Sequence, residues 1–501
     1  MKAGLTAGEL AIDLNASLVG DPGVLLTDVT HDSRSAAAGS LFVAIRGLKM
    51  DGHAYVNAAI ASGASAVCVE EAPAASTVPV LVVRDSRKAL GPASSAIHGH
   101  PSRNLSVVGV TGTNGKTTVT HMVGSIVDAA NGVAGVIGTV GGRMGETPID
   151  LGRTTPEASD FQRLLRRMVE AGVTVVATEV SSHAMTLHRV DGTRFSIVAF
   201  TGLSQDHLDF HGDMDEYFRA KATLFDATFG ERAVINVDDA WGAKLRDLSD
   251  LDGMRVGVDV FASHHEERPG RSVFTLNTPG GSHPVKLPMG GRFNVTNAVI
   301  AAAISLELGF DVEPIVAGLE NMETIPGRFE QIPDKHGRHV FVDYAHTPDG
   351  IAQVIASAAH LSDGRVLAVV GAAGDRDTAK RPLMGRAAAT ANIAVITSDN
   401  PRSERPEDII AEVIGGIPAG ASYHVEPDRR AAIRWAIEQS GPRDIVLVLG
   451  KGHESGQEFA HETVPFDDRV VTAEELAAWG SVRSHTPIYP HNSPAGNGAP
   501  S

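Results

Sequence analysis

Apolar runs of strand length alternate with stretches of helical periodicity almost throughout the chain. Examples are LSVVGV (105–110), NIAVIT (392–397) and DIVLVLG (444–450), each followed by a segment long enough for a helix. This alternation is typical of parallel α/β domains. We therefore predict an α/β fold with mainly parallel sheets.

The predicted strands repeatedly end in glycine or polar residues, as in VVGVTGTNGKTT, VVATEVSSH, VITSDNPRSE and VLVLGKGHE. In open parallel sheets, ligands bind at the carboxyl ends of the strands. Such endings occur both in the middle and in the last third of the chain. Two binding edges of this kind predict a site between domains.

The length of 501 residues allows about three domains. We place an N-terminal α/β domain at 1–103, because the polar segment HGHPSRN ends it. A central domain is predicted at 104–331 and a C-terminal domain with four apolar strand runs at 332–483. The tail 484–501 is rich in Pro, Gly, Ser and Asn, which predicts disorder.

The composition narrows the possible partners. With 43 basic and 60 acidic residues, the net charge of −17 argues against nucleic acid or an anionic membrane as the main partner. The single cysteine, Cys68, lies in an apolar run and is expected in the core, which excludes a disulfide framework. Because the chain has neither a signal-like N-terminus nor a run long enough to span a membrane, we expect a cytoplasmic protein.

The segment GVTGTNGKTT lies between a predicted strand and a predicted helix. Gly112 and Gly115 permit close approach of the backbone to phosphates, which the helix N-terminus also attracts. Lys116 is expected to reach the β- and γ-phosphates and Thr117 to bind Mg²⁺. Val110 stands where the strict phosphate-loop pattern has glycine. The helix is indicated by apolar residues at helical spacing, namely Val119, Met122, Val123, Ile126, Val127 and Ala130.

A lysine interrupts the apolar stripe of another predicted helix. Lys221 lies four residues after Tyr217 and four before Phe225. The helical pattern alone favours a lysine that extends along an apolar face to reach solvent. The alternative is a desolvated amine with a lowered pKa, which can react with CO₂ to form a carbamate that ligates Mg²⁺.

Carboxylates that could bind Mg²⁺ lie near the predicted strand ends. Glu179 ends the run VTVVATE, where a carboxylate can face the phosphate loop. The segment SQDHLDFHGD places Asp206, His207, Asp209 and His211 close together, although such a segment taken alone is usually a capped loop. Histidine is an uncommon Mg²⁺ ligand, so chemistry alone does not assign His207 to the metal.

A longer set of motifs now stands in order along the chain: GVTGTNGKTT, TTPEASDF, EVSSHAMTLHRV, TGLSQDHLDFHGDMDEYFRAKATLF, GRFNVTNAVIAA, IPGRFE, DYAHTPD, GAAGDRDTAKRPLMG, DNPRSE and GKGHE. This set resembles the Mur ligases, and within them the members that add meso-2,6-diaminopimelate. The N-terminal DVTHDSRSAAAGSLFVAIRGLKMDGHAY is similar to the UDP-binding domain of that family. The resemblance covers nearly the whole chain except the tail, and it implies that the C-terminal domain is Rossmann-like.

The resemblance implies an ATP-dependent ligase that joins an amino acid to the D-Glu γ-carboxylate of UDP-N-acetylmuramoyl-L-alanyl-D-glutamate through an acyl phosphate, in peptidoglycan precursor synthesis. ATP and Mg²⁺ are the implied cofactors, and we expect a monomer. The implied nucleotide-binding residues are Gly112, Thr113, Asn114, Gly115, Lys116, Thr117, Thr118, Asn297, Arg328 and Asp343. The implied catalytic or metal-binding residues are Lys116, Thr117, Glu179, His207 and Lys221, the last as a carbamate, which reverses the reading from the helical pattern.

For the nucleotide-peptide substrate, the resemblance implies contacts from Ser33, Thr154, Thr155, Ser181 and Arg189. The chain departs from the family at two positions, with Leu187 where Gln is frequent and Thr201 where Asn is frequent. For diaminopimelate it implies Arg376, Asp399, Asn400, Pro401, Arg402, Gly450 and Glu454.

Asp-Asn-Pro-Arg (399–402) can also be read locally, as a polar turn after a strand, with Pro406 opening the next helix. That reading does not explain Arg402. Diaminopimelate carries one carboxylate more than lysine, and a guanidinium can hold it with two hydrogen bonds. We therefore interpret Arg402 as the specificity determinant.

Three alternatives remain open at this point. The chain could add L-lysine by the same chemistry. It could be another acid–amine ligase, such as a D-Ala-D-Ala-adding enzyme or a folylpolyglutamate synthase, against which the UDP-type N-terminal segment and the DNPR loop argue. It could also be a phosphate-loop binding module without ligase activity, which would predict the loss of Glu179, His207 or Lys221.

Overall fold

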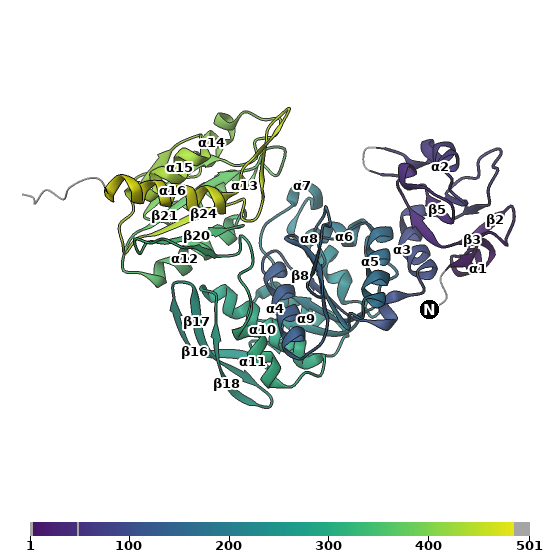
Figure 1. Ribbon diagram of the computed structural model, residues 1–501, viewed down its shortest axis with the longest axis horizontal. Helices are drawn as coiled ribbons and strands as arrows, with labels where there is room; N and C mark the ends of the chain where they lie inside the picture. The colour runs from purple at the N-terminus through teal and green to yellow at the C-terminus, as the bar shows by residue number, and fades with distance from the viewer. Residues whose placement is uncertain (1–3, 48–49, 485–501) are drawn as a thin grey trace, which may run out of the picture. The chain divides into compact units, whose positions relative to one another are not determined.

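The structure is a computed structural model, and it describes residues 4–47 and 50–484 (Figure 1). The chain divides into two compact units, one up to Pro326 and one from Gly327. The predicted disordered tail falls on 485–501, outside the described residues, whereas Ser484 ends helix α16.

The N-terminal part of the first unit contains a five-stranded sheet in the order β2-β7-β6-β5-β4. All neighbours in it are parallel except β2 and β7. Cys68 is fully buried in this sheet, as predicted, and burial raises the pKa of its thiol to about 12. The strands are β2 (Ser17–Val19), β4 (Asp28–Thr30), β5 (Ser40–Val43), β6 (Ala66–Val69) and β7 (Val80–Val82), and the helices are α1 (Ala7–Asp13), α2 (Val56–Ala61) and α3 (Ser86–Ile97).

The central part of the first unit is built on an eight-stranded sheet in the order β11-β10-β9-β12-β8-β13-β14-β15. Only β10 and β11 run antiparallel to their neighbours. The strands are β8 (Ser106–Thr111), β9 (Ala134–Gly138), β10 (Gly141–Met144), β11 (Thr147–Ile149), β12 (Val175–Glu179), β13 (Phe195–Phe200), β14 (Gly230–Asn236) and β15 (Arg255–Val256).

Helices cover both faces of this sheet. Alternate residues of each strand point to opposite faces, and both sets are apolar here, so both faces need a covering layer. Val108 and Val110 pack with α4 (Lys116–Ala129), α10 (Arg292–Glu307) and α11 (Val312–Glu320). Val107 packs on the other side with α5 (Ala158–Glu170) and α8 (Met214–Ala222). The remaining elements are α6 (Ser182–Thr186), α7 (Leu208–His211), α9 (Ala240–Leu248) and the antiparallel sheet of β16 (Phe261–Arg268), β17 (Arg271–Thr278) and β18 (Gly281–Leu287).

The second unit contains a six-stranded sheet in the order β19-β20-β24-β21-β22-β23, parallel except for β19. Helices α15 and α16 pack on one face, and α12, α13 and α14 lie against the other (Figure 1). The strands are β19 (Glu330–Ile332), β20 (His339–Asp343), β21 (Val366–Ala372), β22 (Ile393–Ser398), β23 (Tyr423–Val425), β24 (Ile445–Leu449) and the hairpin β25 (Gly456–Glu458) with β26 (Thr463–Pro465). The helices are α12 (Pro348–Leu361), α13 (Lys380–Ala388), α14 (Pro406–Ile414), α15 (Arg429–Gln439) and α16 (Asp468–Ser484).

The predicted α/β fold class is confirmed. The strand predicted at 392–397 is β22, shifted by one residue, and Pro406 is the first residue of α14, as its fixed φ favours. The division into three domains stays a prediction. Strand β19 pairs with β20, so residues 330–332 belong to the sheet of the second unit.

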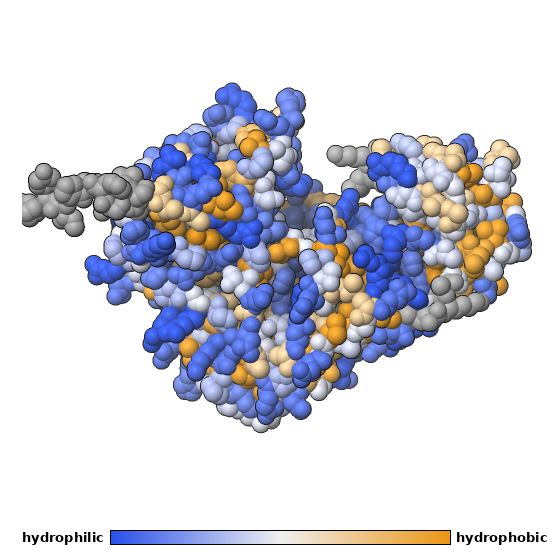
Figure 2. Space-filling model, viewed as in Figure 1, coloured by the Kyte–Doolittle hydropathy of each residue, from blue (hydrophilic) through white to orange (hydrophobic). Residues whose placement is uncertain are grey.

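The visible surface is mostly hydrophilic, which agrees with the charged content of 21% (Figure 2). Apolar side chains gather over α1 and the nearby strands, where Ile12, Val19 and Leu25 are exposed. Among the described residues, none of the helices combines the length and the apolar character that crossing a membrane requires.

Candidate active site

The phosphate loop connects β8 to α4 and depends on two glycines. Gly112 and Gly115 have φ of +147° and +85°, a region that disfavours other residues. A Cβ atom at Gly115 would lie 2.4 Å from Oδ1 of Asn297, and one at Gly112 would lie 1.9 Å from Oγ1 of Thr201. Asn297 on α10 therefore lies directly against the loop, where it was expected.

The loop is held in shape by its own side chains. Nζ of Lys116 donates to the carbonyl oxygens of Gly112 at 2.9 Å and of Thr113 at 2.8 Å. The hydroxyl of Thr201 donates to the carbonyl of Asn114 at 2.6 Å. Thr201, which stands where the resemblance leads one to expect Asn, thus helps to fix the loop.

Glu179 joins the phosphate loop to Thr139 and, through it, to Thr154. It is the last residue of β12, buried, and its Oε1 accepts from Oγ1 of Thr117 at 2.8 Å and from the backbone N–H of Thr139 at 2.7 Å. The hydroxyl of Thr139 also lies 3.0 Å from that of Thr154. Three predicted residues, Thr117, Glu179 and Thr154, are brought together through Thr139.

Lys221 is fully buried on α8, so the interpretation of a lysine that extends to solvent is wrong. Its Nζ donates to the carbonyl oxygen of Gly112 at 2.8 Å and lies 4.8 Å from the centre of the Tyr217 ring. Burial lowers the pKa of this amine well below its usual value, and the nearby charge of Lys116 lowers it further. The neutral form, which carries the nucleophilic lone pair, is therefore favoured.

His207 lies close to the same helix with its side chain 42% exposed. Its Nε2 is 3.3 Å from Oδ2 of Asp206, and its ring stands edge-on to that of His183 at 4.8 Å. Burial lowers the pKa of His183, and it lowers the pKa of His211 to about 4. These two imidazoles are therefore neutral at pH 7.

The residues present fit a magnesium ion that a substrate completes. Mg²⁺ prefers oxygen ligands and keeps several waters. Thr117 and Glu179 present two oxygens 2.8 Å apart at the loop. Within residues 4–47 and 50–484, no three His, Cys, Asp or Glu side chains form a cage that could hold a metal alone. The donor set thus suits a metal held jointly with phosphates.

The predicted contacts to the nucleotide-peptide surround a buried carboxylate. The Oε1 atom of Glu157 lies 3.1 Å from Nε of Arg189 and accepts from Arg153 at 3.1 Å, and its Oε2 accepts from Arg87 at 2.7 Å. Arg189 also donates to the carbonyl of Thr155 at 3.3 Å. Three guanidinium groups around one carboxylate leave a local excess of positive charge.

Ser181 and Ser33 occupy capping and turn positions. Oγ of Ser181 accepts from the backbone of Ala184 at the start of α6, and its N–H donates to Oγ1 of Thr155 at 3.3 Å. Ser33 begins a short 3₁₀ turn capped by Asp32 and is half-buried. Ser181 is therefore part of the cluster around Glu157, whereas Ser33 belongs to the N-terminal sheet region.

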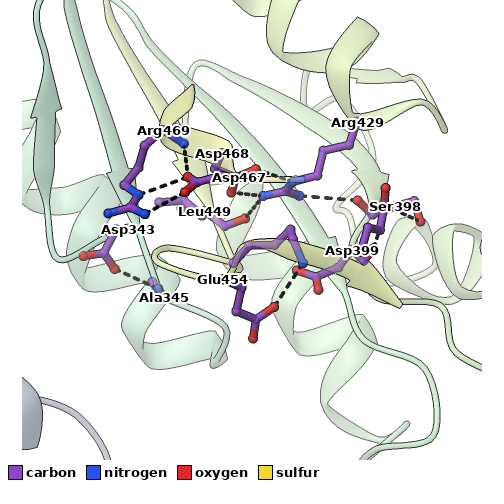
Figure 3. Close-up of polar contacts among 12 residues, drawn as sticks. Asp343, Ala345, Ser398, Asp399, Arg429, Leu449, Glu454, Asp467, Asp468 and Arg469 are labelled. Atoms are coloured by element: carbon purple, nitrogen blue, oxygen red, sulfur yellow. Dashed lines mark hydrogen bonds and ion pairs between the residues drawn. The ribbon is translucent and has the colours of Figure 1, made fainter. Parts of the chain in front are cut away.

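In the second unit, Asp343 ends β20 and is buried (Figure 3). It accepts from the N–H groups of Phe329 and Ala345, both at 2.7 Å. Burial raises the pKa of its carboxyl group, and Arg328 opposes that rise. The guanidinium of Arg328 lies 4.7 Å from the ring centre of Tyr344. The two predicted nucleotide-binding residues of this unit thus interact electrostatically.

The Asp-Asn-Pro-Arg loop follows β22 and is anchored to the loop after β24. Nδ2 of Asn400 donates to Oε2 of Glu454 at 2.8 Å, and Oδ1 of Asn400 accepts from Nζ of Lys451 at 2.8 Å. A Cβ atom at Gly450 would lie 2.5 Å from Oδ2 of Asp399, so the two loops are in contact. The segment is therefore more than an isolated turn.

Arg402 has a φ of +51°, unusual for a residue other than glycine. Its Nε donates to Glu458 at 2.7 Å and its Nη1 donates to the carbonyl of Gly374 at 2.7 Å. Pro401 is buried, whereas Arg376 is exposed. The contact of Arg376 with an amino acid stays a prediction.

Four residues of these clusters were missed from sequence: Thr139, Glu157, Lys451 and Glu458. Glu157 and Lys451 stand inside quoted motifs, TTPEASDF and GKGHE, which was the available signal. Nothing in the sequence pairs Arg402 with Glu458, because that contact depends on where the β25–β26 hairpin folds back.

Family models match three consecutive parts of the chain. They are described as the Mur ligase family catalytic domain at 26–98, the Mur ligase middle domain at 110–305, and the Mur ligase glutamate ligase domain at 327–452. The chain belongs to the Mur ligase family. The resemblance found in the sequence is thereby confirmed, and the phosphate loop and Glu179 of this Mur ligase lie within the middle domain.

Two relatives illustrate the similarity, both named UDP-N-acetylmuramoyl-L-alanyl-D-glutamate--2,6-diaminopimelate ligase. The one from Geobacillus kaustophilus (strain HTA426) is 42% identical over 466 residues, 90% of this chain and 94% of its own. The one from Aquifex aeolicus (strain VF5) is 40% identical over 458 residues, 91% and 94% of the two chains. A solved structure described by the same enzyme name is 31% identical with a TM-score of 0.68, covering 96% of this chain and all of the other.

Proposed function

We propose that this Mur ligase joins meso-2,6-diaminopimelate to the D-Glu γ-carboxylate of UDP-N-acetylmuramoyl-L-alanyl-D-glutamate, with ATP as the source of energy. The γ-carboxylate attacks the γ-phosphorus of ATP, which releases ADP and leaves an acyl phosphate. The amine of diaminopimelate then attacks the acyl carbon, loses a proton, and displaces phosphate. The observation that carries the proposal is the phosphate loop held against Glu179, in a chain about 40% identical to ligases of that name.

The phosphate loop supports ATP as the nucleotide. Gly112, Gly115 and the N-terminus of α4 provide backbone N–H groups for phosphates. Lys116 now bonds two loop carbonyls and can exchange them for the β- and γ-phosphates. Its charge would then stabilise the negative charge that moves toward the leaving ADP. Asn297, Arg328 and Asp343 are proposed to contact the rest of the nucleotide, together with the loop residues Thr113, Asn114 and Thr118.

Mg²⁺ is proposed to bind at Thr117 and Glu179, with His207 and a modified Lys221 as further ligands. A bound magnesium ion supplies charge neutralisation and orientation of phosphate oxygens. Thr117 and Glu179 hold each other in place, since the threonine hydroxyl donates to the carboxylate. Thr139 also holds this carboxylate, because its backbone N–H donates to Oε1 of Glu179 and its hydroxyl donates to Oε2.

Lys221 is proposed to carry a carbamate. Its neutral amine can attack CO₂, forming an N–C bond and releasing one proton. The product is an anion beside Lys116, which relieves the repulsion between two cationic groups. Without the modification, a buried amine at this place has no evident function.

The arginine cluster around Glu157 supports an anionic substrate. Arg189, with Thr155 and Ser181 at its side, is proposed to hold the D-Glu moiety. Thr154, which touches the Glu179 network, and Ser33 of the N-terminal region are proposed as further contacts. The excess positive charge at Glu157 suits a substrate that carries carboxylates and a diphosphate.

Arg402 supports diaminopimelate over lysine. Its side chain is fixed by Glu458 and by the carbonyl of Gly374, and its Nη2 atom makes no hydrogen bond within the described residues. A guanidinium that is held in this way can bind the distal carboxylate, which lysine lacks. Asp399, Asn400, Pro401, Gly450, Glu454 and Arg376 are proposed to complete the amino-acid site.

We further propose that the enzyme acts in the cytoplasm as a monomer, because its reaction consumes ATP and all catalytic roles are assigned to one chain. The function is tested by phosphate release with UDP-MurNAc-L-Ala-D-Glu and ATP in the presence of meso-diaminopimelate, L-lysine or D-Ala-D-Ala. Release with diaminopimelate alone is expected. Equal release with L-lysine would establish the lysine-adding activity instead, and no amino-acid-dependent release would remove the ligase proposal.

A further inference from the structure

Lys451 is the most deeply buried charged residue of the amino-acid site. It follows β24, and its side chain has no exposed surface. Its Nζ donates to Oδ1 of Asn400 at 2.8 Å and to Oε2 of Glu454 at 3.0 Å. A buried lysine is costly unless it is paired, so these two contacts account for its presence.

The three side chains form a closed ring of hydrogen bonds, because Nδ2 of Asn400 also donates to Oε2 of Glu454 at 2.8 Å. An amide has one donor end and one acceptor end. Since Lys451 can only donate, it fixes the oxygen of Asn400 toward itself and the nitrogen toward Glu454. The backbone N–H of Glu458 donates to the same amide oxygen at 3.0 Å and adds to this constraint.

The ring uses only one oxygen of Glu454. Oε2 accepts two hydrogen bonds, whereas Oε1 has no hydrogen-bond partner among the residues that the structure describes. The carboxylate side chain is 33% exposed, so that Oε1 remains available to a ligand cation. The ring is also next to Arg402, whose backbone N–H donates to the carbonyl of Glu458 at 2.9 Å.

Lys451 is the buried cation that is hydrogen-bonded to Glu454. Asp399 and Glu454 are close enough to the buried Arg429 to affect it electrostatically, and Arg429 is already paired with Asp468 (Figure 3). Removing the Lys451 charge leaves the carboxylate of Glu454 without its buried cation. Without the hydrogen bond from Lys451 the Glu454 side chain can reorient, and Oε1 is then no longer held where a ligand ammonium needs it.

We infer that Lys451 is a positioning residue that fixes Asn400 and aims Oε1 of Glu454 at the distal ammonium group of the amino-acid substrate. This inference rests on the proposed diaminopimelate-adding function. Arg402 and Glu454 would then recognise the two charged groups on the distal carbon, one each. Lys451 acts through Glu454 and touches no reacting atom.

The test compares diaminopimelate with 2-aminopimelate, which keeps the distal carboxylate and lacks the distal ammonium. For the unsubstituted protein, kcat/KM should favour diaminopimelate. In Lys451→Met that preference should fall about tenfold or more, since a charge-assisted hydrogen bond is lost. The KM for ATP should stay within about threefold of its value in the unsubstituted protein. General structural damage would change both the preference and the KM for ATP, so a change in the preference alone indicates a positioning role. The matched control is Lys335→Met, an exposed lysine of the same unit, which should leave the preference unchanged.

Lys451→Gln serves as a second variant. Its side-chain amide can still donate a hydrogen bond to Asn400, and it places no apolar side chain in the polar ring. It should lose part of the preference, and thermal melting checks that it is folded. An unchanged preference in a folded Lys451 variant would overturn the inference while the unsubstituted enzyme still uses diaminopimelate. Absence of diaminopimelate-dependent phosphate release in the unsubstituted protein would overturn the proposed function, and this inference with it.

Discussion

Lys116 and Lys221 donate hydrogen bonds to the same acceptor, the carbonyl oxygen of Gly112, at 2.9 and 2.8 Å. One lysine comes from the start of α4 and the other from α8, 105 positions apart in the printed sequence. Two ammonium groups that share one carbonyl repel each other, and a neutral amine at one of them relieves that repulsion. Burial and the charge of Lys116 both lower the pKa of Lys221, which favours Lys221 as the neutral member of the pair.

Lys221→Ala should therefore inactivate the enzyme and leave it folded. The substitution removes the amine that CO₂ would modify, and short-chain carboxylic acids such as acetate should restore part of the activity by replacing the carbamate. Phosphate release, measured with and without added carboxylate, checks this. Lys244→Ala, an exposed lysine of the same unit that bonds Asp215, is the control and should need no rescue. Full activity of Lys221→Ala without any added acid would contradict the carbamate.

Depletion of CO₂ provides a second approach to the same site without any substitution. If the carbamate forms from the neutral amine, removing CO₂ and bicarbonate should lower activity, and adding bicarbonate should restore it. Lower pH should also reduce activity as the amine of Lys221 gains its proton. The lowered pKa of this amine extends the pH range in which the neutral form is available. An activity that is the same with and without bicarbonate at every pH would contradict this prediction.

Lys116→Ala should reduce kcat by about 10²-fold or more, the usual effect of removing a group that stabilises transition-state charge. The lysine donates hydrogen bonds to the loop carbonyls of Gly112 and Thr113, and the protein should remain folded without it. Single-turnover phosphate release and a melting curve measure the two properties. A folded Lys116→Ala variant with unchanged kcat would show that the loop does not serve ATP.

Arg402→Lys keeps the charge and loses the planar fork that holds a carboxylate with two hydrogen bonds. Use of diaminopimelate should fall by about 10- to 100-fold in kcat/KM, while the KM for ATP is preserved. Arg405→Lys, an exposed arginine three positions further along the chain, is the matched control. Unchanged kinetics with diaminopimelate would show that Arg402 does not determine specificity and that Asp-Asn-Pro-Arg serves only as a turn.

The parts of the site that sequence could predict are those that follow from one strand and the loop after it. Glu179 was placed at the end of a strand because an apolar run stops there, and it is the last residue of β12. The burial of Lys221 contradicted the local helical pattern, because the Gly112 carbonyl that accepts its hydrogen bond belongs to the loop after β8. Local periodicity contains no information on such a partner.

The parts that sequence missed depend on contacts between distant segments. Glu157 is bonded by Arg87, 70 positions away, and Lys451 is bonded to Asn400, 51 positions away. Glu157 and Lys451 are both charged residues inside the quoted motifs. The functions predicted from those motifs were assigned to neighbouring residues instead. Arg87 lies on α3 and Glu157 directly before α5, whereas Asn400 and Lys451 follow β22 and β24, so only the tertiary structure shows these contacts.

Arg429 and Asp468 form a fully buried ion pair with two hydrogen bonds, at 2.8 and 2.6 Å. Arg429 also donates to the carbonyl of Leu449 at 2.9 Å, the last residue of β24 (Figure 3). Arg429→Met leaves Asp468 buried without its cation, which should lower the free energy of unfolding by about 3–5 kcal/mol. Urea denaturation of the full chain measures this change.

The double variant Arg429→Met/Asp468→Leu removes both charges and should recover much of that loss, because apolar pairs of similar volume often replace buried ion pairs without destabilisation. Arg405→Met is the matched control. Arg405 pairs with Glu407 on the surface, with 75% of its side chain exposed, so its loss should cost about 0–1 kcal/mol. If Arg429→Met were as mild as the control, the pair would contribute little to the strand ends that carry Asp399 and Gly450. If the double variant were stable but used diaminopimelate poorly, the pair would act on the geometry of the loops rather than on folding.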